Sequence, residues 1–232
     1  MQKLFDADIL DILPTDDGFI YAARETLPDE SVVGTFHYYN RVENTLDVST
    51  VVTYIKEKFG ENGFEVARAV GDFITCGVEQ LSNGTFVASY PDGSIKVVGI
   101  GGEIITEAQV FYQEAAGLSP VSNGNDLWFA VPDGNAIINY SIKHNRIEFR
   151  IGGPKSKSFC HPVSLVKYDN TLFICTAYSY KIRAVNLDTY NVTDYKNFNE
   201  PVLKYFRSAG TEYVMMQSGV YAINEPTAQP EE

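Results

Sequence analysis

The stretch SNGTFVASYPDGSIKVVGI, at residues 82–100, has a close counterpart in SNGNDLWFAVPDGNAIINYSI, at residues 122–142. In both, an Asn-Gly turn is followed by a short apolar run, a Pro-Asp-Gly turn and a second apolar run. Asn-Gly and Asp-Gly supply the positive φ angles that tight hairpins require. The chain therefore repeats one unit of strands and turns, with a shift of 40 residues between the two Ser-Asn-Gly turns.

The same unit can be followed, more weakly, along the rest of the chain. Central turns fall near residues 17, 83, 123, 169 and 209, so the spacings are 66, 40, 46 and 40 residues. Repeats of about 40–50 residues with four short strands each are typical of β-propeller blades. We therefore predict an all-β, five-bladed β-propeller.

The strands between these turns define the expected blades. We predict a single propeller domain over residues 1–226, with blades at about 6–70, 72–111, 114–151, 160–196 and 200–224, and a polar C-terminal tail at 227–232. The fifth blade lacks a fourth strand of its own. We expect residues 2–5 to supply it and to close the ring, which removes the open sheet edges.

The long first spacing predicts a short insertion in blade one. Residues 46–60 have apolar residues at helical spacing and Gly60 as a stop signal, which favours a short helix, with an extra strand as the alternative. Residues 64–70 are expected to form the fourth strand of this blade. The insertion either contacts a partner or packs on its own blade.

Composition argues against several classes of partner. The formal net charge of −12 is the opposite of the basic surface that nucleic acid binding requires, and an anionic membrane would repel it. The N-terminal residues MQKLFDADILDIL lack the regions of a secretory signal, and the three cysteines have no regular spacing. We therefore expect a cytoplasmic or virion-associated protein with reduced cysteines.

Blade four carries a resemblance to a known repeat. In residues 161–189, Pro162 leads into an apolar strand. The positions of the repeat that follow are occupied by Leu172, Phe173 and Ile174, by Lys181 and Ile182, and by Leu187 and Asp188. This pattern resembles the NHL-type propeller repeat and the related SMP-30 and lyase superfamily. The resemblance implies a propeller and no particular reaction.

Enzymes of the SMP-30 group hold a divalent metal with a Glu, Asn and Asp set, and this set has no clear counterpart here. Asp6, Asp8 and Asp11 lie on the first strand without an obvious Glu ligand. Zinc sites usually show close ligand pairs in the sequence, and such pairs are lacking among Cys160, Cys175, His161 and Cys76. No dinucleotide or phosphate-binding motif is present. We expect no metal and no cofactor.

The expected binding face consists of the loops between blades and the loops that join second and third strands. Its candidate binding residues are Asp92, Asp133, Phe159, Tyr178 and Tyr180. Asp92 and Asp133 also fit a simpler role as turn formers, because Asp in an Asp-Gly turn accepts hydrogen bonds from nearby backbone amides.

Three functions remain open from the sequence. The leading hypothesis is a non-catalytic module that docks partner proteins, as a structural component of a larger assembly such as a virion. The first alternative is a lyase or lactonase-type enzyme with His161, Glu200 and Glu25 over the central channel. The second is a sugar-binding lectin, which should repeat its binding residues in every blade; the Tyr178 and Tyr180 pair does not recur in blades two and three.

Overall fold

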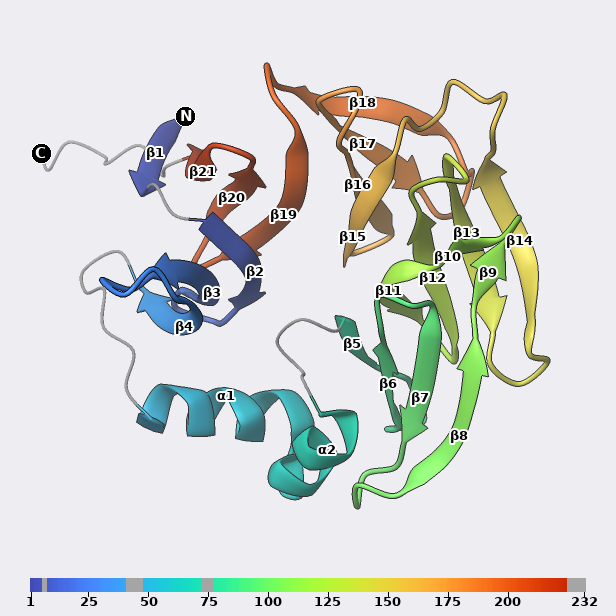
Figure 1. Cartoon of the computed structure of the whole chain (residues 1–232). Coiled ribbons are helices and arrows are strands. Elements are labelled where there is room, and N and C mark those ends of the chain that lie inside the picture. The colour runs from blue at the N-terminus through green and yellow to red at the C-terminus, as the bar shows by residue number, and fades with distance from the viewer. Residues whose placement is uncertain (6–7, 41–47, 72–76, 225–232) are drawn as a thin grey trace, which may run out of the picture.

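The computed structural model describes residues 1–5, 8–40, 48–71 and 77–224. Five small antiparallel sheets are arranged in a ring around a common centre, which confirms the five-bladed β-propeller (Figure 1). The innermost strand of every blade faces the middle of the ring. No helix in the described ranges is long and apolar enough to cross a membrane.

The blades follow one another in chain order. Blade one has β2 (Asp8–Pro14), β3 (Phe19–Thr26) and β4 (Val32–Tyr39). Blade two has β5 (Gly77–Gln80), β6 (Phe86–Ser89), β7 (Ser94–Val98) and β8 (Ile104–Gln109). Blade three has β11 (Leu118–Asn123), β12 (Asp126–Val131), β13 (Ala136–Ser141) and β14 (Arg146–Gly152). Blade four has β15 (Pro162–Tyr168), β16 (Thr171–Thr176), β17 (Lys181–Asn186) and β18 (Val192–Asn197).

Blade five is completed from the other end of the chain. Its own strands are β19 (Val202–Ser208), β20 (Thr211–Met216) and β21 (Gly219–Asn224), and β1 (Gln2–Phe5) pairs antiparallel with β21. Gln2 lies opposite Ala222, and Phe5 lies opposite Val220. The predicted closure by residues 2–5 is therefore confirmed.

The insertion in blade one is helical, and one prediction for it is wrong. Helix α1 (Val48–Phe59) ends at Gly60, whose φ of 79° only glycine adopts easily, as predicted. Residues 64–70 are not a strand, because they lie in a second helix, α2 (Gly63–Val70). The buried residues of this helix are Gly63, Val66, Ala67 and Val70. Their spacing of three to four residues is that of one helical face and does not alternate as in a strand.

The two helices fill the space between blade one and blade two. Tyr54 and Phe59 of α1 and Val66 of α2 pack in one apolar cluster with Tyr38 of blade one and Phe86 of blade two. The hydroxyl of Tyr90 donates to the carbonyl of Val70 at 2.6 Å, which attaches α2 to blade two. The insertion thus serves as packing between two blades (Figure 1).

Five apolar clusters among the described residues each lie between neighbouring blades. Blade five shows the two extremes. Its contact with blade one is aromatic: the rings of Phe19 and Phe206 meet edge to face at 5.1 Å, and Phe19 and Tyr213 do so at 5.3 Å. We call this the aromatic interface.

The contact between blade five and blade four combines apolar packing with a polar network around Glu212. The Glu212 carboxylate accepts hydrogen bonds from the hydroxyls of Tyr195 and Tyr205 at 2.5 and 2.6 Å. Lys196 Nζ and Arg207 Nη2 approach it at 2.9 and 3.0 Å. We call this the Glu212 interface.

Candidate functional site

The loops that join second and third strands, with the connections between blades, form the loop face of the ring. It also carries a small hairpin, β9 (Phe111–Tyr112) paired with β10 (Ala115–Ala116), between blades two and three. Arg150 Nη1 donates to the Tyr112 hydroxyl at 2.6 Å, and its guanidinium lies 5.2 Å from the Tyr112 ring centroid. Sequence reasoning missed this hairpin, because each of its strands has only two residues.

Tyr178 and His161 form a stacked pair at the junction of blades three and four. Their ring centroids lie 4.1 Å apart and their planes differ by 7°. Tyr178 is 68% exposed, whereas the His161 side chain is 23% exposed. One face of the tyrosine ring is therefore supported by the protein while much of the side chain meets solvent.

Backbone hydrogen bonds hold this pair in place. The backbone amide of His161 donates to Asn135 Oδ1 at 2.8 Å, and His161 has a left-handed φ of 56°. Its carbonyl accepts from the amide of Ala177 at 3.0 Å. Because residues from two hairpins fix His161, the stacked pair is a rigid part of the fold.

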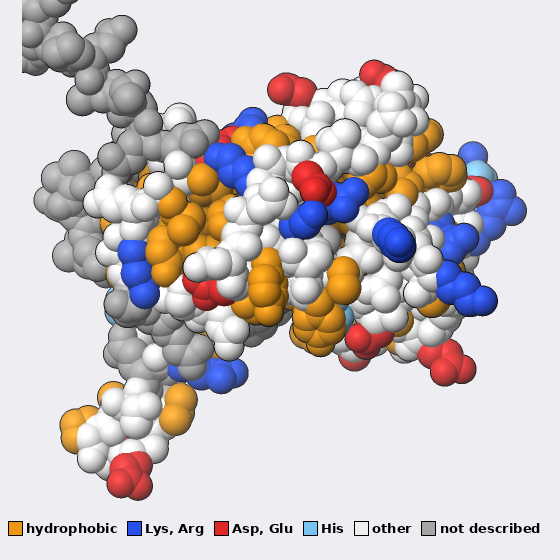
Figure 2. Space-filling model, turned by 90° about the horizontal axis from the view of Figure 1, so that it is seen from above, with side chains coloured by type: hydrophobic (Ala, Val, Ile, Leu, Met, Phe, Trp, Pro, Cys, Tyr) orange, Lys and Arg blue, Asp and Glu red, His pale blue; other side chains and the backbone are white. Residues whose placement is uncertain are grey.

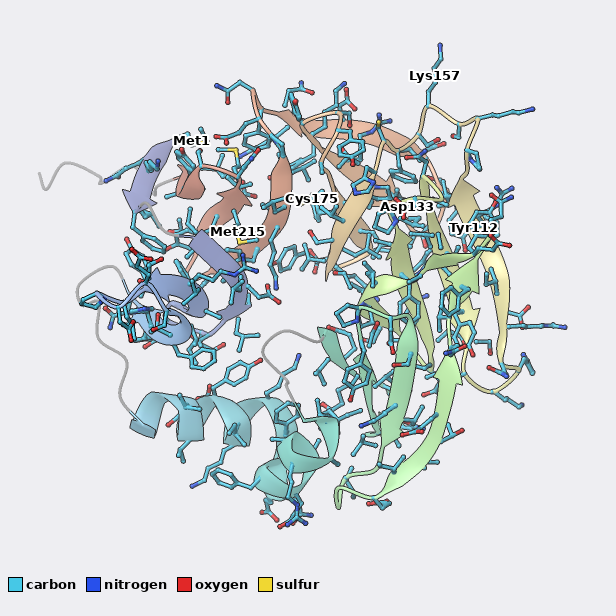
Figure 3. All side chains as sticks on the ribbon, in the orientation of Figure 1. Met1, Tyr112, Asp133, Lys157, Cys175 and Met215 are labelled. Carbon is cyan, nitrogen blue, oxygen red and sulfur yellow. The ribbon has the colours of Figure 1, made fainter. Side chains whose placement is uncertain are left out.

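Asp133 lies beside this pair, and Tyr180 follows Tyr178 two residues later in the same loop. Asp133 Oδ1 is 3.7 Å from His161 Nδ1, and the Asp133 side chain is 83% exposed. Figure 3 shows Asp133 nearer the ring centre than Lys157, which projects outward at the ring margin. Tyr180 is 40% exposed, and its carbonyl accepts from the amide of Phe198 at 2.8 Å. The structure therefore brings together two of the candidate binding residues, Asp133 and Tyr178, at His161.

The other two candidate binding residues have local structural roles. Asp92 Oδ1 accepts from the amide and hydroxyl of Ser94 at 2.9 and 2.6 Å, and these bonds lower the pKa of Asp92. Phe159 is buried between blades three and four, with Trp128 and Leu165 in the same cluster. Asp92 therefore shapes its turn, and Phe159 supports the loop from below.

The candidate catalytic residues have separate surroundings. The Glu200 carboxylate accepts from the amide of Ser218 at 3.0 Å and also from its hydroxyl, within blade five. His161 contacts Asp133 and Tyr178 instead. Glu25 lies in β3, and its side chain is outside the described part of the chain. Among the described residues, His161 and Glu200 thus have different partners and do not form a pair.

The described residues contain no cluster of three His, Cys, Asp or Glu side chains that could bind a metal ion. The expectation of no metal site stays a prediction for the chain as a whole. Cys175 is buried, and burial raises the pKa of its thiol to about 12, so it stays protonated and inert at neutral pH. Cys160 is exposed, and both cysteines are free. Cys76 and Asp6 fall outside the described ranges.

A cavity of about 250 Å³ opens in the centre of the ring, and all five innermost strands line it. In blades one, four and five the strand pairing skips one residue, at Leu10, Val163 and Leu203. Such bulges bend a strand and let consecutive side chains reach the same side. The bulges thus bring both the skipped residue and its successor, such as Asp11 or Lys204, to the cavity.

An ion pair on the wall of this cavity joins the innermost strands of the adjacent blades one and five. Lys204 Nζ lies 2.5 Å from Asp11 Oδ1, and both residues also line a second cavity of about 270 Å³. The pair therefore lies where the two cavities meet. Asp11, one of the residues considered for a metal set, has a cation from blade five as its partner.

No family model matches the sequence, and no curated protein matches it. Among solved structures, the computationally designed Ika4 protein has 16% identity over 60% of this chain and 86% of its own, with a TM-score of 0.45. The computationally designed Ika8 protein has 14% identity over 91% of this chain and 57% of its own, with a TM-score of 0.47.

Glutaminyl cyclase from Myxococcus xanthus has 12% identity over 60% of this chain and 59% of its own, with a TM-score of 0.43. The chain thus spans less than two thirds of the length of the cyclase and of Ika8. At these identities and scores the comparisons say nothing about what this protein does.

Proposed function

We propose that this chain is a non-catalytic binding module, a single propeller domain over residues 1–226 whose loop face docks a partner protein. The observation that carries the proposal is the exposed Tyr178 ring, held rigid by its stack on His161. Large aromatic side chains dominate the binding energy of many interfaces. A ring that is already ordered loses little conformational entropy when a partner binds.

The surface around Tyr178 mixes apolar and charged groups. Asp133 is exposed near it, Tyr180 is exposed in the same loop, and Lys155 and Lys157 are exposed on the loop between β14 and β15. Figure 2 shows one edge of the ring, where hydrophobic side chains reach the surface in separate groups between charged ones. An apolar anchor surrounded by charges is the usual composition of a protein interface.

The sugar-binding alternative gains less support. In blades two, three and four the second-to-third-strand loop contains a left-handed residue, Gly93, Asn135 or Tyr180. The residue two positions before it is Pro91, Asp133 or Tyr178. An aromatic ring therefore stands at this position in blade four alone among these three, whereas a repeated lectin site needs it in each.

The finer parts of the proposal follow from the sequence. Membership of the NHL-type repeat group stays a prediction. A place in a larger assembly such as a virion is also a prediction, and affinity capture can test it. The lyase-type alternative predicts turnover of small lactones that depends on His161.

The test is affinity capture from the native source with the wild-type chain and two variants in parallel. Tyr178→Ala should lose a stoichiometric partner, because truncation of an aromatic anchor costs about 2 kcal/mol or more, roughly 30-fold in affinity. Tyr190→Ala is the matched control: it removes a 45% exposed tyrosine from the loop between β17 and β18, on the opposite face. A monomer that hydrolyses lactones, or capture that Tyr178→Ala leaves unchanged, would overturn the proposal.

A further inference from the structure

Blade one has three strands in the described part of the chain, whereas each other blade has four. The fourth, outermost strands of the other blades are β8, β14, β18 and β1. In blade one, β4 pairs with β3 on one side, and no described strand pairs with its other edge. Among the described residues, nothing therefore occupies the position beside β4 that holds a fourth strand in the other blades.

The pairing of β3 with β4 shows which backbone groups point to this edge. The amide of Leu27 donates to the carbonyl of Ser31 at 2.8 Å, so hydrogen-bonded pairs recur at every second residue from there. Val32, Gly34 and Phe36 alternate with those pairs, and their amides and carbonyls point away from β3. Further along, Tyr38 is buried beside helix α1, which limits the open edge to residues 32–36.

The open edge lacks the charges that natural sheets use to prevent strand pairing. Residues 32–39 read VVGTFHYY and contain no Lys, Arg, Asp or Glu. Each of the other outermost strands has at least one: Glu107 in β8, Arg146, Glu148 and Arg150 in β14, Asp194 and Lys196 in β18, and Lys3 in β1. A charge-free edge is a template on which another strand can pair.

The side chains on this edge leave room for such a strand. Val32 is 62% exposed and Phe36 is 45% exposed. A Cβ atom added to Gly34 would meet nothing within 4 Å. These three residues alternate along β4, so they present two apolar side chains and a gap on one side of the sheet.

The chemistry of the edge specifies what would bind. Outward amides and carbonyls are matched by the backbone of another extended chain, as β1 already shows in blade five. A second copy would bring a second net charge of −12, and the β3–β4 turn carries exposed Asp29 and Glu30. Charge complementarity therefore favours a basic segment of another protein over self-association.

We propose that the outer edge of β4 accepts an extended, basic segment of a partner protein with alternating apolar residues, which becomes the fourth strand of blade one. This edge is separate from the surface around Tyr178 on the loop face. The inference therefore does not rest on docking at that surface, and each can fail without the other.

The probe is the synthetic peptide KHNRIEFRIG, which copies residues 143–152, an outer strand of this chain with three basic residues and one acidic residue. Amide hydrogen exchange of the full chain is measured by NMR with and without peptide. The amides of Val32, Gly34 and Phe36 should exchange rapidly in the free protein and at least about tenfold more slowly with peptide, because the added strand hydrogen-bonds to them. A peptide with proline in place of Phe149 should have no effect, because proline cannot donate to the ladder.

Two variants of the protein show where the peptide binds. Phe36→Lys should abolish the protection, and Val32→Lys serves the same purpose if the first variant does not fold. Ile105→Lys, at a 54% exposed position of β8, is the matched control and should leave the protection unchanged.

Several results would overturn the proposal. Amides of Val32, Gly34 and Phe36 that are already protected in the free monomer would mean that the chain covers its own edge. Protection that grows with protein concentration would identify a second copy as the occupant. No protection at millimolar peptide, or protection that Phe36→Lys leaves intact, would show that the edge does not accept a strand.

Discussion

Blade five contacts its two neighbours in different ways. The aromatic interface with blade one consists of rings such as Phe19, Phe206 and Tyr213, in edge-to-face or stacked contact. At the Glu212 interface with blade four, a carboxylate receives hydrogen bonds and cations from both blades. Arg207 of this network also covers the rings of Tyr168 and Phe173, at 4.6 and 5.3 Å from their centroids.

The difference concerns both energy and response to conditions. Burial of aromatic area is stabilising at any pH and is largely non-directional. A buried carboxylate is stabilising only while its partners and its charge are present. Burial would raise the pKa of Glu212, but the hydrogen bonds from Tyr195, Tyr205 and Lys196 outweigh burial and lower the pKa to about 2. We infer that the Glu212 interface makes the ring sensitive to acid at the junction of blades four and five.

The largest effect is expected from the aromatic interface. Phe19→Ala should lower the free energy of unfolding by about 4 kcal/mol, because the ring is fully buried and its removal leaves a cavity. Urea titration followed by tryptophan fluorescence measures this change. Phe111→Ala, at a 41% exposed position, is the control and should shift stability by less than about 0.5 kcal/mol. Equal losses in the two variants would contradict the assignment of this interface as core.

The Glu212 interface should give an intermediate effect. Glu212→Ala should cost about 3 kcal/mol at pH 7, because Lys196, Arg207 and two tyrosine hydroxyls lose their shared acceptor. Unfolding at fixed pH, by the same urea titration, gives the value. Glu148→Ala removes an exposed carboxylate paired with Arg146 and should have no measurable effect.

The pH dependence sharpens the same comparison. The pKa of Glu212 is lower in the folded than in the unfolded state, so its ionised carboxylate contributes to the free energy of unfolding. That contribution is fully present above the pKa of the unfolded state, roughly 4.3. It is then lost as the pH falls toward about 2. Phe19→Ala should retain this acid-dependent loss of stability, and Glu212→Ala should reduce it. A Glu212→Ala protein with an unchanged acid profile would disprove the role of this carboxylate.

The smallest effect is expected at the third type of interface, the one filled by helices. Tyr38→Phe should cost about 1 kcal/mol, because it removes the hydrogen bond from the Tyr38 hydroxyl to Asp17 at 2.5 Å and keeps the ring. Burial, with a further contribution from Asp17, raises the pKa of Tyr38 to about 12. The contribution of the protonated Tyr38 hydroxyl to the free energy of unfolding is therefore present below about pH 10 and lost as the pH rises toward 12. Stability measured from pH 8 to 12 should decline less in the variant than in the wild type.

The fold could be predicted because its signals are local. Asn-Gly and Asp-Gly turns mark hairpins in blades one to three, and five recurrences of the central turn indicate the number of blades. The N-terminal closure followed from a count of strands, since the last blade lacked one. The helix at 63–70 was missed because GFEVARAV was assigned by its place in the repeat, although its apolar residues have helical spacing.

The site could be predicted only in part, because its geometry depends on distant residues. Tyr178 was found as an aromatic in a loop, but its stack on His161 depends on Asn135, which lies in the preceding blade. The Glu212 network joins three strands, β18, β19 and β20, and leaves no motif in the sequence. Phe159 looked like a loop residue, and its burial follows from the path of the loop between blades three and four.

The pairing of β1 with β21 also has a consequence for biosynthesis. Gln2–Phe5 leave the ribosome before the other strands of the ring, yet their partner strand β21 is made after those strands, on the order of tens of seconds later at ordinary rates of translation. Four blades can assemble as they emerge, while the amino-terminal strand waits unpaired beside an unfinished ring. The slowest event in folding should therefore be the pairing of β1 with β21, and a chaperone that shields β1 until then would raise the yield of closed rings.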